Sequence, residues 1–401
     1  MGRTALKHVP LWLVICGLGV TQIIGWGTTY YMLGALSGDI ANATGWPEAL
    51  IFGAFSASLL LSGLISRWTG RITDRLGGRR VMMTGSVFAA AGLAMMGGFP
   101  STITYALGWL LLGVAMRFAT YDAAFASLTQ IAGSGARRAI SYLTLFGGLA
   151  STVFWPVSHY MSLSVGWAET LLVYAALHLI VCLPIHWAVL GGALGDAPNE
   201  ASTTVAPSLA PGPARRRAMI LFATAVALNG LVFSAISAHV LPLFAGLGFP
   251  GNEAVLMAAL IGPSQVASRL GEIMMGRRFT AIQLGLFAFG LLPAAIGIFA
   301  LLGFSWSAAI LFGILYGASN GLVTIAKGAV PLMLFGTKGY GEVLGVIATP
   351  NLILNAAAPL LFALLLNATT PEIAMLVAGA AALASSLFML WLARLHPQQG
   401  E

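Results

Sequence analysis

Twelve apolar stretches follow one another along this chain, and each is long enough to cross a lipid bilayer. All but three of the 19 Lys and Arg residues fall on the two tails or on the even-numbered connections between these stretches. The odd-numbered connections carry none. Cytoplasmic segments of membrane proteins carry such an excess of positive charge. The pattern therefore predicts a multi-pass membrane protein with both termini in the cytoplasm.

The composition excludes several classes of protein. The chain has 401 residues, of which 58% are hydrophobic and 8% charged, whereas about 25% of the residues of a soluble domain are charged. The connections are too short for a catalytic domain, so we expect no enzyme. The net charge of +7 is spread over the connections, where it touches anionic lipid and calls for no nucleic acid. The sequence shows no ATP-binding loop and no paired metal ligands, and we expect no cofactor.

One long break divides the apolar stretches six and six. Residues 192–216 are rich in Gly and Pro and end in three consecutive arginines, a composition that cannot bury a core. We expect a cytoplasmic linker there, between six-helix bundles at 1–191 and 217–401. Internal duplication of this kind is typical of transporters whose substrate site lies where the two halves meet. The expected helices cover residues 9–36, 47–66, 80–98, 102–130, 140–163, 168–191, 217–245, 253–275, 281–303, 306–333, 340–367 and 371–394.

The connection after the second helix carries a recognisable motif. From Gly70 it reads Gly-Arg-Ile-Thr-Asp-Arg-Leu-Gly-Gly-Arg-Arg, which resembles the G-x-L-x-D-R-x-G-R-R signature of the major facilitator superfamily. The resemblance implies an all-α membrane protein of twelve transmembrane helices, in two six-helix halves around a central cavity. In that family the motif braces a gate, and its Asp meets a helix end from the other half. This carries a gating role to Gly70, Asp74, Arg75, Gly77, Arg79 and Arg80.

One position departs from the family pattern. The basic residue expected four positions after Asp74 is Gly78, with Arg79 next, so either Arg79 substitutes for it or the brace is weaker. Asp122 lies near the cytoplasmic end of the fourth helix, where it could accept Arg75 or Arg79 in the same brace. Proton carriage is its alternative role.

Arg117, Arg269 and Lys327 are the three basic residues inside apolar stretches. Buried charges in membranes are costly and mark functional sites. On a continuous helix, Arg117 and Asp122 would point about 140° apart, so we do not expect Asp122 simply to neutralise Arg117. Lys327 follows Asn320 and Thr324 along one helix face, which favours cavity lining; snorkelling to the interface is the alternative.

The eighth helix carries the strongest indication of a substrate. Its segment from Gly262 to Arg269 is similar to the monocarboxylate-transporter pattern, in which an Asp precedes a substrate-binding Arg by four residues. Gln265 stands at the place of that Asp, so carboxylate binding carries over better than proton coupling. A structural bridge from Arg269 to Glu272 is the alternative. The segment from Gln22 to Tyr31 is similar to bacterial members of the monocarboxylate and oxalate–formate branches, which implies the inner membrane of a bacterium.

These residues predict a secondary transporter that moves a small, monocarboxylate-like organic anion by alternating access. A net positive interior favours an anionic substrate, and protons are a candidate second ligand. Two alternatives stay open: an exporter of amphipathic or toxic compounds, and a non-transporting sensor on the same fold. We expect a monomer in the bilayer. The expected substrate-binding residues are Arg269, Gln265, Arg117, Gln22, Tyr30, Asn320, Lys327 and Asn355.

The charge pattern makes a direct prediction about topology. Reporter fusions after Ser202, in the expected linker, and after Glu401 should both behave as cytoplasmic, because the basic residues lie on that side. Paired alkaline-phosphatase and fluorescent-protein fusions measure this. A periplasmic signal at either site would contradict the assignment.

Overall fold

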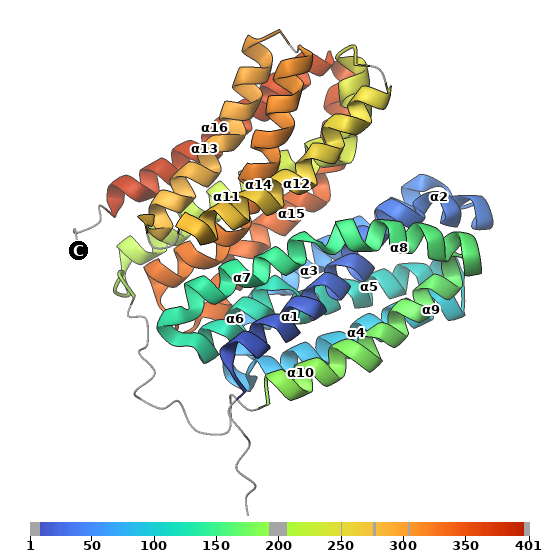
Figure 1. Cartoon of the computed structure of the whole chain (residues 1–401), viewed down its shortest axis with the longest axis horizontal. Coiled ribbons are helices and arrows are strands. Elements are labelled where there is room, and N and C mark those ends of the chain that lie inside the picture. Colours follow the sequence, from blue (N-terminus) through green and yellow to red (C-terminus); the bar gives the residue numbers. More distant parts are fainter. Residues whose placement is uncertain (1–8, 192–206, 250, 276–277, 304, 397–401) are drawn as a thin grey trace, which may run out of the picture. The chain divides into compact units, whose positions relative to one another are not determined.

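The computed structural model describes residues 9–191, 207–249, 251–275, 278–303 and 305–396, and every regular element in these ranges is a helix (Figure 1). The chain forms two compact units. One comprises Met1–Ala206 and Gly336–Gly345, and the other Pro207–Phe335 and Val346–Glu401. Most of the expected linker lies outside the described residues, and the helix that follows begins at Pro213, before the expected end at 216.

Among the described residues of the first unit, ten α-helices precede the Gly336–Gly345 segment in the sequence (Figure 1). They are α1 (Leu11–Trp26), α2 (Met32–Thr44), α3 (Glu48–Leu76), α4 (Gly78–Gly98), α5 (Thr102–Ala119), α6 (Tyr121–Ala132), α7 (Ala136–Gly148), α8 (Ala150–Val165), α9 (Trp167–Leu177) and α10 (Leu183–Val189).

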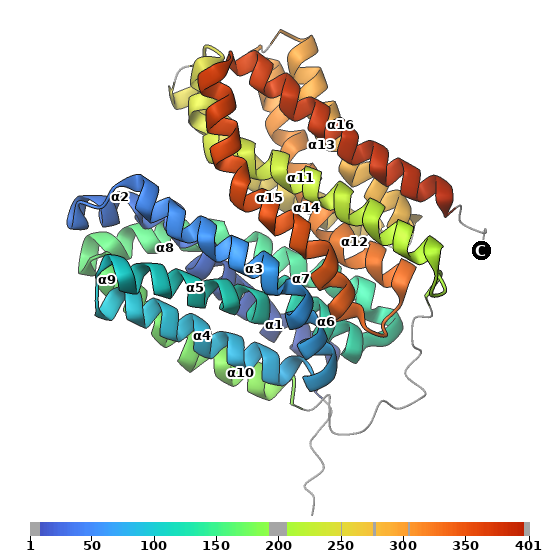
Figure 2. The ribbon, with the colours of Figure 1, turned by 180° about the vertical axis from the view of Figure 1, so that it is seen from behind.

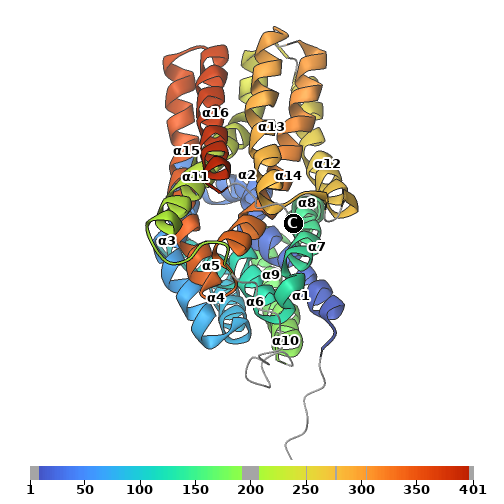
Figure 3. The same cartoon turned by 90° about the vertical axis from the view of Figure 1, so that its left-hand side faces the viewer.

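The second unit contains α11 (Pro213–Gly246), α12 (Gly251–Met275), α13 (Ala281–Leu301), α14 (Trp306–Phe335), most of α15 (Tyr340–Ala368) and α16 (Pro371–Leu395). In this unit α13 packs beside α14 and α16 (Figure 3), and α11 packs along α16 (Figure 2).

Each unit has its own aromatic core. In the first, Trp109 is fully buried and meets Phe55 and Tyr105 edge to face, at centroid distances of 5.1 and 6.2 Å. In the second, Phe299 and Tyr316 both stack on Phe312, at centroid distances of 5.2 and 5.3 Å. Large buried aromatic rings supply much of the packing energy of a core. Many large apolar side chains are also exposed, including Trp12, Trp68 and Phe99, as expected where the solvent is lipid.

Two short π-helical turns interrupt the first unit. Gly27–Tyr31 links α1 to α2, and His178–Cys182 links α9 to α10. The Thr28 hydroxyl and His178 Nε2 share a 2.8 Å hydrogen bond between the two turns. The expected helix 9–36 is therefore not regular throughout, because the π turn begins directly after α1 ends at Trp26. Such turns leave backbone groups that need partners nearby.

Ten stretches of described helix are long and apolar enough to cross a membrane, which confirms a multi-pass membrane protein. One of them, Thr102–Val165, has 64 residues, more than twice what one crossing of about 20 residues needs, and it turns at Gly133–Gly135. α12 is not among the ten. The count of twelve transmembrane helices therefore stays a prediction.

Close helix packing in the first unit can be tested at Gly113 on α5. A Cβ atom at Gly113 would lie 2.5 Å from the backbone oxygen of Ser58, which cannot turn aside. Overpacking of this kind costs about 1–3 kcal/mol, so Gly113→Ala should lower the melting temperature measured in detergent. Gly53→Ala is the matched control, because nothing lies within 4 Å of its Cβ position. Equal melting temperatures would show that the contact is not tight.

Candidate functional site

The motif at the end of α3 contacts the beginning of α15. Asp74 Oδ1 accepts a hydrogen bond from the backbone N–H of Gly341 at 2.9 Å, and Oδ2 accepts one from Glu342 at 2.8 Å. The first N–H groups of a helix have no partner within it, and a carboxylate there also interacts favourably with the helix dipole. The Gly336–Gly345 segment belongs to the same compact unit as Asp74.

A second carboxylate, on α15, contacts α3. Glu342 Oε1 lies 3.1 Å from Arg67 Nε and 2.8 Å from Arg71 Nη2. Both arginine side chains are more than a third exposed, so each pair alone contributes little to stability. The contacts between the two helices are therefore reciprocal. An acid of α3 binds backbone amides of α15, and an acid of α15 binds arginines of α3.

Glycines allow this approach. A Cβ atom on Gly70 would lie 2.0 Å from the oxygen of Gly341, and one on Gly345 would lie 2.2 Å from the oxygen of Ser66. Any side chain at either position would force the two backbones apart. Gly70 of the motif thus allows α3 to pack closely on α15, a role that the sequence did not show.

The structure corrects the expectation for Arg117 and Asp122. Arg117 Nη1 donates to Asp122 Oδ2, and the two form an ion pair. They meet because the fourth helix is broken: α5 ends at Ala119, Thr120 is extended (φ −96°, ψ −161°), and α6 begins at Tyr121. The 140° separation held only for a continuous helix. Asp122 therefore pairs with Arg117, and neither Arg75 nor Arg79 is its partner in the structure.

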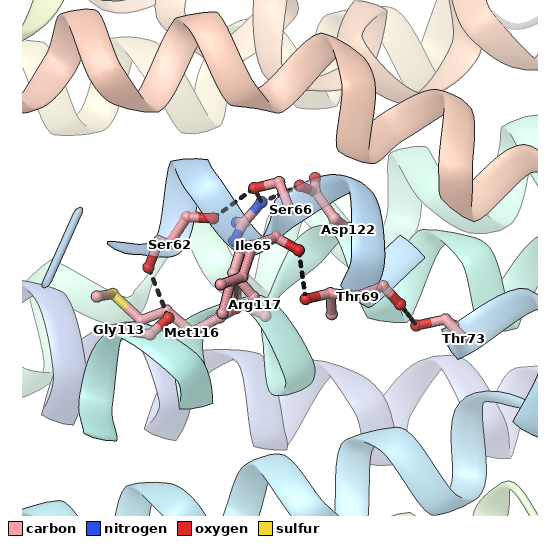
Figure 4. A network of polar contacts seen from close by, with 10 residues as sticks. Ser62, Ile65, Ser66, Thr69, Thr73, Gly113, Met116, Arg117 and Asp122 are labelled. Carbon is pink, nitrogen blue, oxygen red and sulfur yellow. Dashed lines mark hydrogen bonds and ion pairs between the residues drawn. The ribbon is translucent and has the colours of Figure 1, made fainter. Parts of the chain in front are cut away.

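Hydroxyl groups of α3 lie beside this ion pair (Figure 4). Arg117 Nη1 lies 3.5 Å from Ser66 Oγ, and Ser66 in turn donates to the carbonyl of Ser62 at 2.6 Å. The Ser62 hydroxyl bridges to α5 by donating to Gly113 O at 2.6 Å. Arg117 is 7% exposed, so this charge lies deep within the unit.

A cavity of about 10 Å³ adjoins the pair, which is roughly the room that one water molecule occupies. Residues of α3, α5, α6 and α15 line it: Ser66, Thr69, Gly70, Thr73, Arg117, Asp122, Ala123, Gly341 and Gly345. The ion pair and the α3–α15 contact therefore share one polar region.

The remaining residues of the motif lie apart from the Asp74 contact and make contacts of their own or are exposed. Gly77 ends α3 with a positive φ of 78°, a conformation that favours glycine. Gly78 lies against α6, where an added Cβ would meet Ser127 Oγ at 1.8 Å. The guanidinium carbon of Arg79 lies 5.2 Å from the Trp187 ring centre. Arg75 and Arg80 are exposed. α3 continues to Leu76, so most of the expected loop is helical.

Gln22 is buried and serves the helix break. Its Nε2 donates to the carbonyl of Ala119 at 2.9 Å. Ala119 is the last residue of α5, where helical carbonyls lose their partners. The structure therefore gives Gln22 a structural contact at this position. Its Oε1 has no hydrogen-bond partner among the described residues.

Tyr30 belongs to an aromatic cluster on the first helix. Its ring contacts Trp26, Tyr31 and Phe55 at centroid distances of 5.3–5.5 Å. Trp26 also contacts Tyr121 at 5.2 Å, next to the Thr120 break. The cluster presents large apolar faces with polar hydroxyl groups at their edges.

In the second unit, Arg269 is 3% exposed. Its Nε donates to the carbonyl of Gly321 on α14 at 3.3 Å. A Cβ atom at Gly321 would lie 2.6 Å from the oxygen of Gln265, so α12 and α14 pack closely here. Gln265 is half-buried on the same helix. This hydrogen bond uses the Nε–H group of the guanidinium and links α12 to α14.

The other expected residues of this unit lie on α14 and α15. Asn320 and Lys327 are half-buried, and Asn320 O accepts the Thr324 hydroxyl at 2.8 Å. The Asn355 amide, oriented by its hydrogen-bond pattern, donates to Gly230 O at 2.8 Å and to Asn351 O at 3.2 Å. Asn355 thus ties α15 to α11.

Sequence reasoning missed Glu342 and gave no role to Ser66, Arg67 or Arg71. An acid in the first turn of a helix is usually explained by the helix dipole. The position of Glu342 therefore gave no indication of its arginine partners. The glycines at 341 and 345 were the available signal, because a Cβ atom at either position would lie 2.7 Å or less from a backbone oxygen of α3. Among the residues that the structure describes, no cluster of three or more His, Cys, Asp or Glu could hold a metal ion.

Comparison with known proteins agrees with this architecture. The profile of the Major Facilitator Superfamily matches residues 15–326. The chain is 26% identical over 323 residues to "Monocarboxylate transporter 11" of Mus musculus. The matched region covers 73% of this chain and 70% of that protein.

Two solved structures share the fold. One is the human organic anion transporter MFSD10 (TETRAN), with a TM-score of 0.73, 17% identity and coverage of 95% of this chain and 100% of that one. The other is the proton:xylose symporter XylE, with a TM-score of 0.66, 12% identity and 95% coverage of both chains. At these identities the likeness concerns the fold. Because the superfamily profile matches residues 15–326, more than half of the chain, the protein belongs to the major facilitator superfamily of membrane transporters.

Proposed function

We propose that the protein moves a small organic anion, of the monocarboxylate type, across the membrane by alternating access. The observation that carries this proposal is Arg269, an arginine buried in a membrane protein whose Nε donates to the carbonyl of Gly321. The 26% identity to a protein named as a monocarboxylate transporter supports the same substrate class.

The chemistry of Arg269 suits a carboxylate. A guanidinium donates two parallel hydrogen bonds to the two oxygens of a carboxylate, and such charge-assisted pairs are about twice as strong as neutral ones. The Nε bond to Gly321 restricts the motion of the guanidinium before substrate arrives, which would lower the entropy lost on binding. Gln265, one helical turn earlier, is proposed to donate to the same anion.

The first unit is proposed to hold the gate and the coupling elements. The α3–α15 contact, built by Asp74, Glu342, Arg67 and Arg71, would form in one state of the transport cycle and break in another. Four hydrogen bonds and ion pairs link the two helices, so breaking them changes the balance between states. The Arg117–Asp122 pair lies beside this contact and is proposed as the place where a proton would be held.

One observation favours a second candidate function. The aromatic cluster of Trp26, Tyr30, Tyr31 and Phe55 offers the apolar faces that an exporter of amphipathic compounds would use. Aromatic faces also attract organic cations.

Counterflow in proteoliposomes separates these functions. Vesicles preloaded with lactate, oxalate or a hydrophobic cation are diluted into the same labelled compound. Labelled anion should accumulate, and it should not do so in empty vesicles. Accumulation of the cation alone would instead support the exporter, and no accumulation of any compound would count against both.

The gate predicts a specific kinetic defect. Asp74→Asn leaves one acceptor for two N–H groups, so it should slow turnover by about tenfold while equilibrium binding changes only a few-fold. Gly70→Ala should do the same without altering charge, because its Cβ would meet Gly341 O at 2.0 Å. Gly53→Ala is the control. Uptake rates and substrate binding by calorimetry are the measurements, and binding lost in proportion to transport would contradict the gate.

The proposed role of Arg269 predicts that its substitution weakens substrate binding. Removing one partner of a buried charged pair costs about 2–5 kcal/mol, so Arg269→Ala should weaken substrate binding at least about thirtyfold. Arg269→Lys should rescue it only in part, because an ammonium group lacks the planar fork. Arg278→Ala is the control, since Arg278 is exposed beyond the end of α12.

A structural role for Arg269 gives a different pattern. If Arg269 serves only as a bridge to Glu272, then Glu272→Gln should be as harmful as Arg269→Ala, and the double variant should regain folding. A well-folded Arg269→Ala protein with normal transport would remove the main support for an anionic substrate.

A further inference from the structure

A groove of about 600 Å³ lies in the second unit, between the first turns of α11 and the last turns of α16. The two helices pack along each other, and Figure 2 shows these turns at the same end of the unit. Six side chains build most of its wall: Arg216, Arg217, Ile220, Leu221, Phe388 and Trp391. None of the proposed substrate-binding residues lines this groove.

The wall has two chemical halves. Ile220, Leu221, Phe388 and Trp391 are apolar, and Ile220 and Trp391 are 56% and 53% exposed. Both helices contain stretches long and apolar enough to cross a membrane, Pro213–Val240 and Pro371–Leu395. This half of the groove thus continues into helices whose natural solvent is hydrocarbon.

The charged half comes from the start of α11. Arg216 and Arg217 are both exposed at the groove. Their neighbour Arg215 is engaged elsewhere: its Nη1 donates to Phe335 O at 3.3 Å, and its guanidinium lies 4.9 Å from the Phe335 ring centre. The three consecutive arginines therefore divide, one fixing the local structure and two facing the groove.

We propose that this groove binds an anionic phospholipid of the surrounding bilayer. The phosphate would accept hydrogen bonds from Arg216 and Arg217, which suit phosphate oxygens through their planar forks. An acyl chain would lie against Ile220, Leu221, Phe388 and Trp391. Basic pockets between membrane helices are typical binding places for anionic head groups. The proposal does not depend on which substrate the protein transports.

The test uses the full-length protein in a mild detergent, with phosphatidylglycerol or phosphatidylcholine added at equal mole fraction. Phosphatidylglycerol should raise the melting temperature by several degrees more than phosphatidylcholine does. R216Q/R217Q should abolish that difference, while the control R137Q/R138Q, an adjacent pair at the start of α7, should retain it. Raising the salt concentration should reduce the effect in the wild type.

Two further arms separate the lipid from simpler ligands. Inorganic phosphate at the same concentration should give no comparable stabilisation, because it cannot occupy the apolar half. Trp391→Ala should weaken the phosphatidylglycerol effect, whereas Trp12→Ala, at an exposed tryptophan of α1, should not. Native mass spectrometry should show one phosphatidylglycerol retained by the wild type and lost from R216Q/R217Q.

Several results would overturn the proposal. They are equal stabilisation by phosphatidylcholine, equal stabilisation by phosphate, or an unchanged phosphatidylglycerol effect in R216Q/R217Q. If that double variant does not purify as a monodisperse protein, Trp391→Ala and the salt titration decide. A lipid effect insensitive to both would mean that the groove is not the site.

Discussion

Within a bilayer, a backbone carbonyl or amide that loses its helical partner must find another inside the protein. This constraint accounts for much of the polar structure of the molecule. Asp74 accepts the first N–H groups of α15, and Gln22 donates to the last carbonyl of α5. Ser234 donates at 3.0 Å to the carbonyl of Asn355, the group that Pro359, four residues later, leaves without a donor. Polar side chains are therefore placed where helices begin, end or break.

The features that followed from sequence were those governed by composition and local pattern. The alternation of apolar stretches and basic connections predicted an all-helical, multi-pass protein, and the motif from Gly70 to Arg80 predicted the superfamily. Both are confirmed. The resemblance also led to Asp74 as a residue that meets a helix end, and the structure places it on the first amides of α15.

Other features depended on contacts that sequence does not encode locally. The Arg117–Asp122 pair could not be foreseen, because a helical-wheel argument assumes an unbroken helix and nothing around Thr120 signals an extended residue. Glu342 was missed because its partners, Arg67 and Arg71, are distant in sequence. Substrate binding by Gln22 and Asn355 stays a prediction, and their amides also contact backbone carbonyls that the sequence did not indicate. A polar residue on a membrane helix predicts that a partner exists but does not identify it.

The membership of residues Gly336–Gly345 in the first unit has a mechanical consequence. α15 is one helix, yet its first residues belong to one unit and its residues from Val346 onward to the other. Pro350 lies within α15 and has no N–H to offer the carbonyl four residues before it, which is that of Val346. The helix thus lacks a hydrogen bond at the residue where it passes between units. Bending there costs less than bending at an intact turn of the helix, so the crossing between the units coincides with a point where α15 can flex.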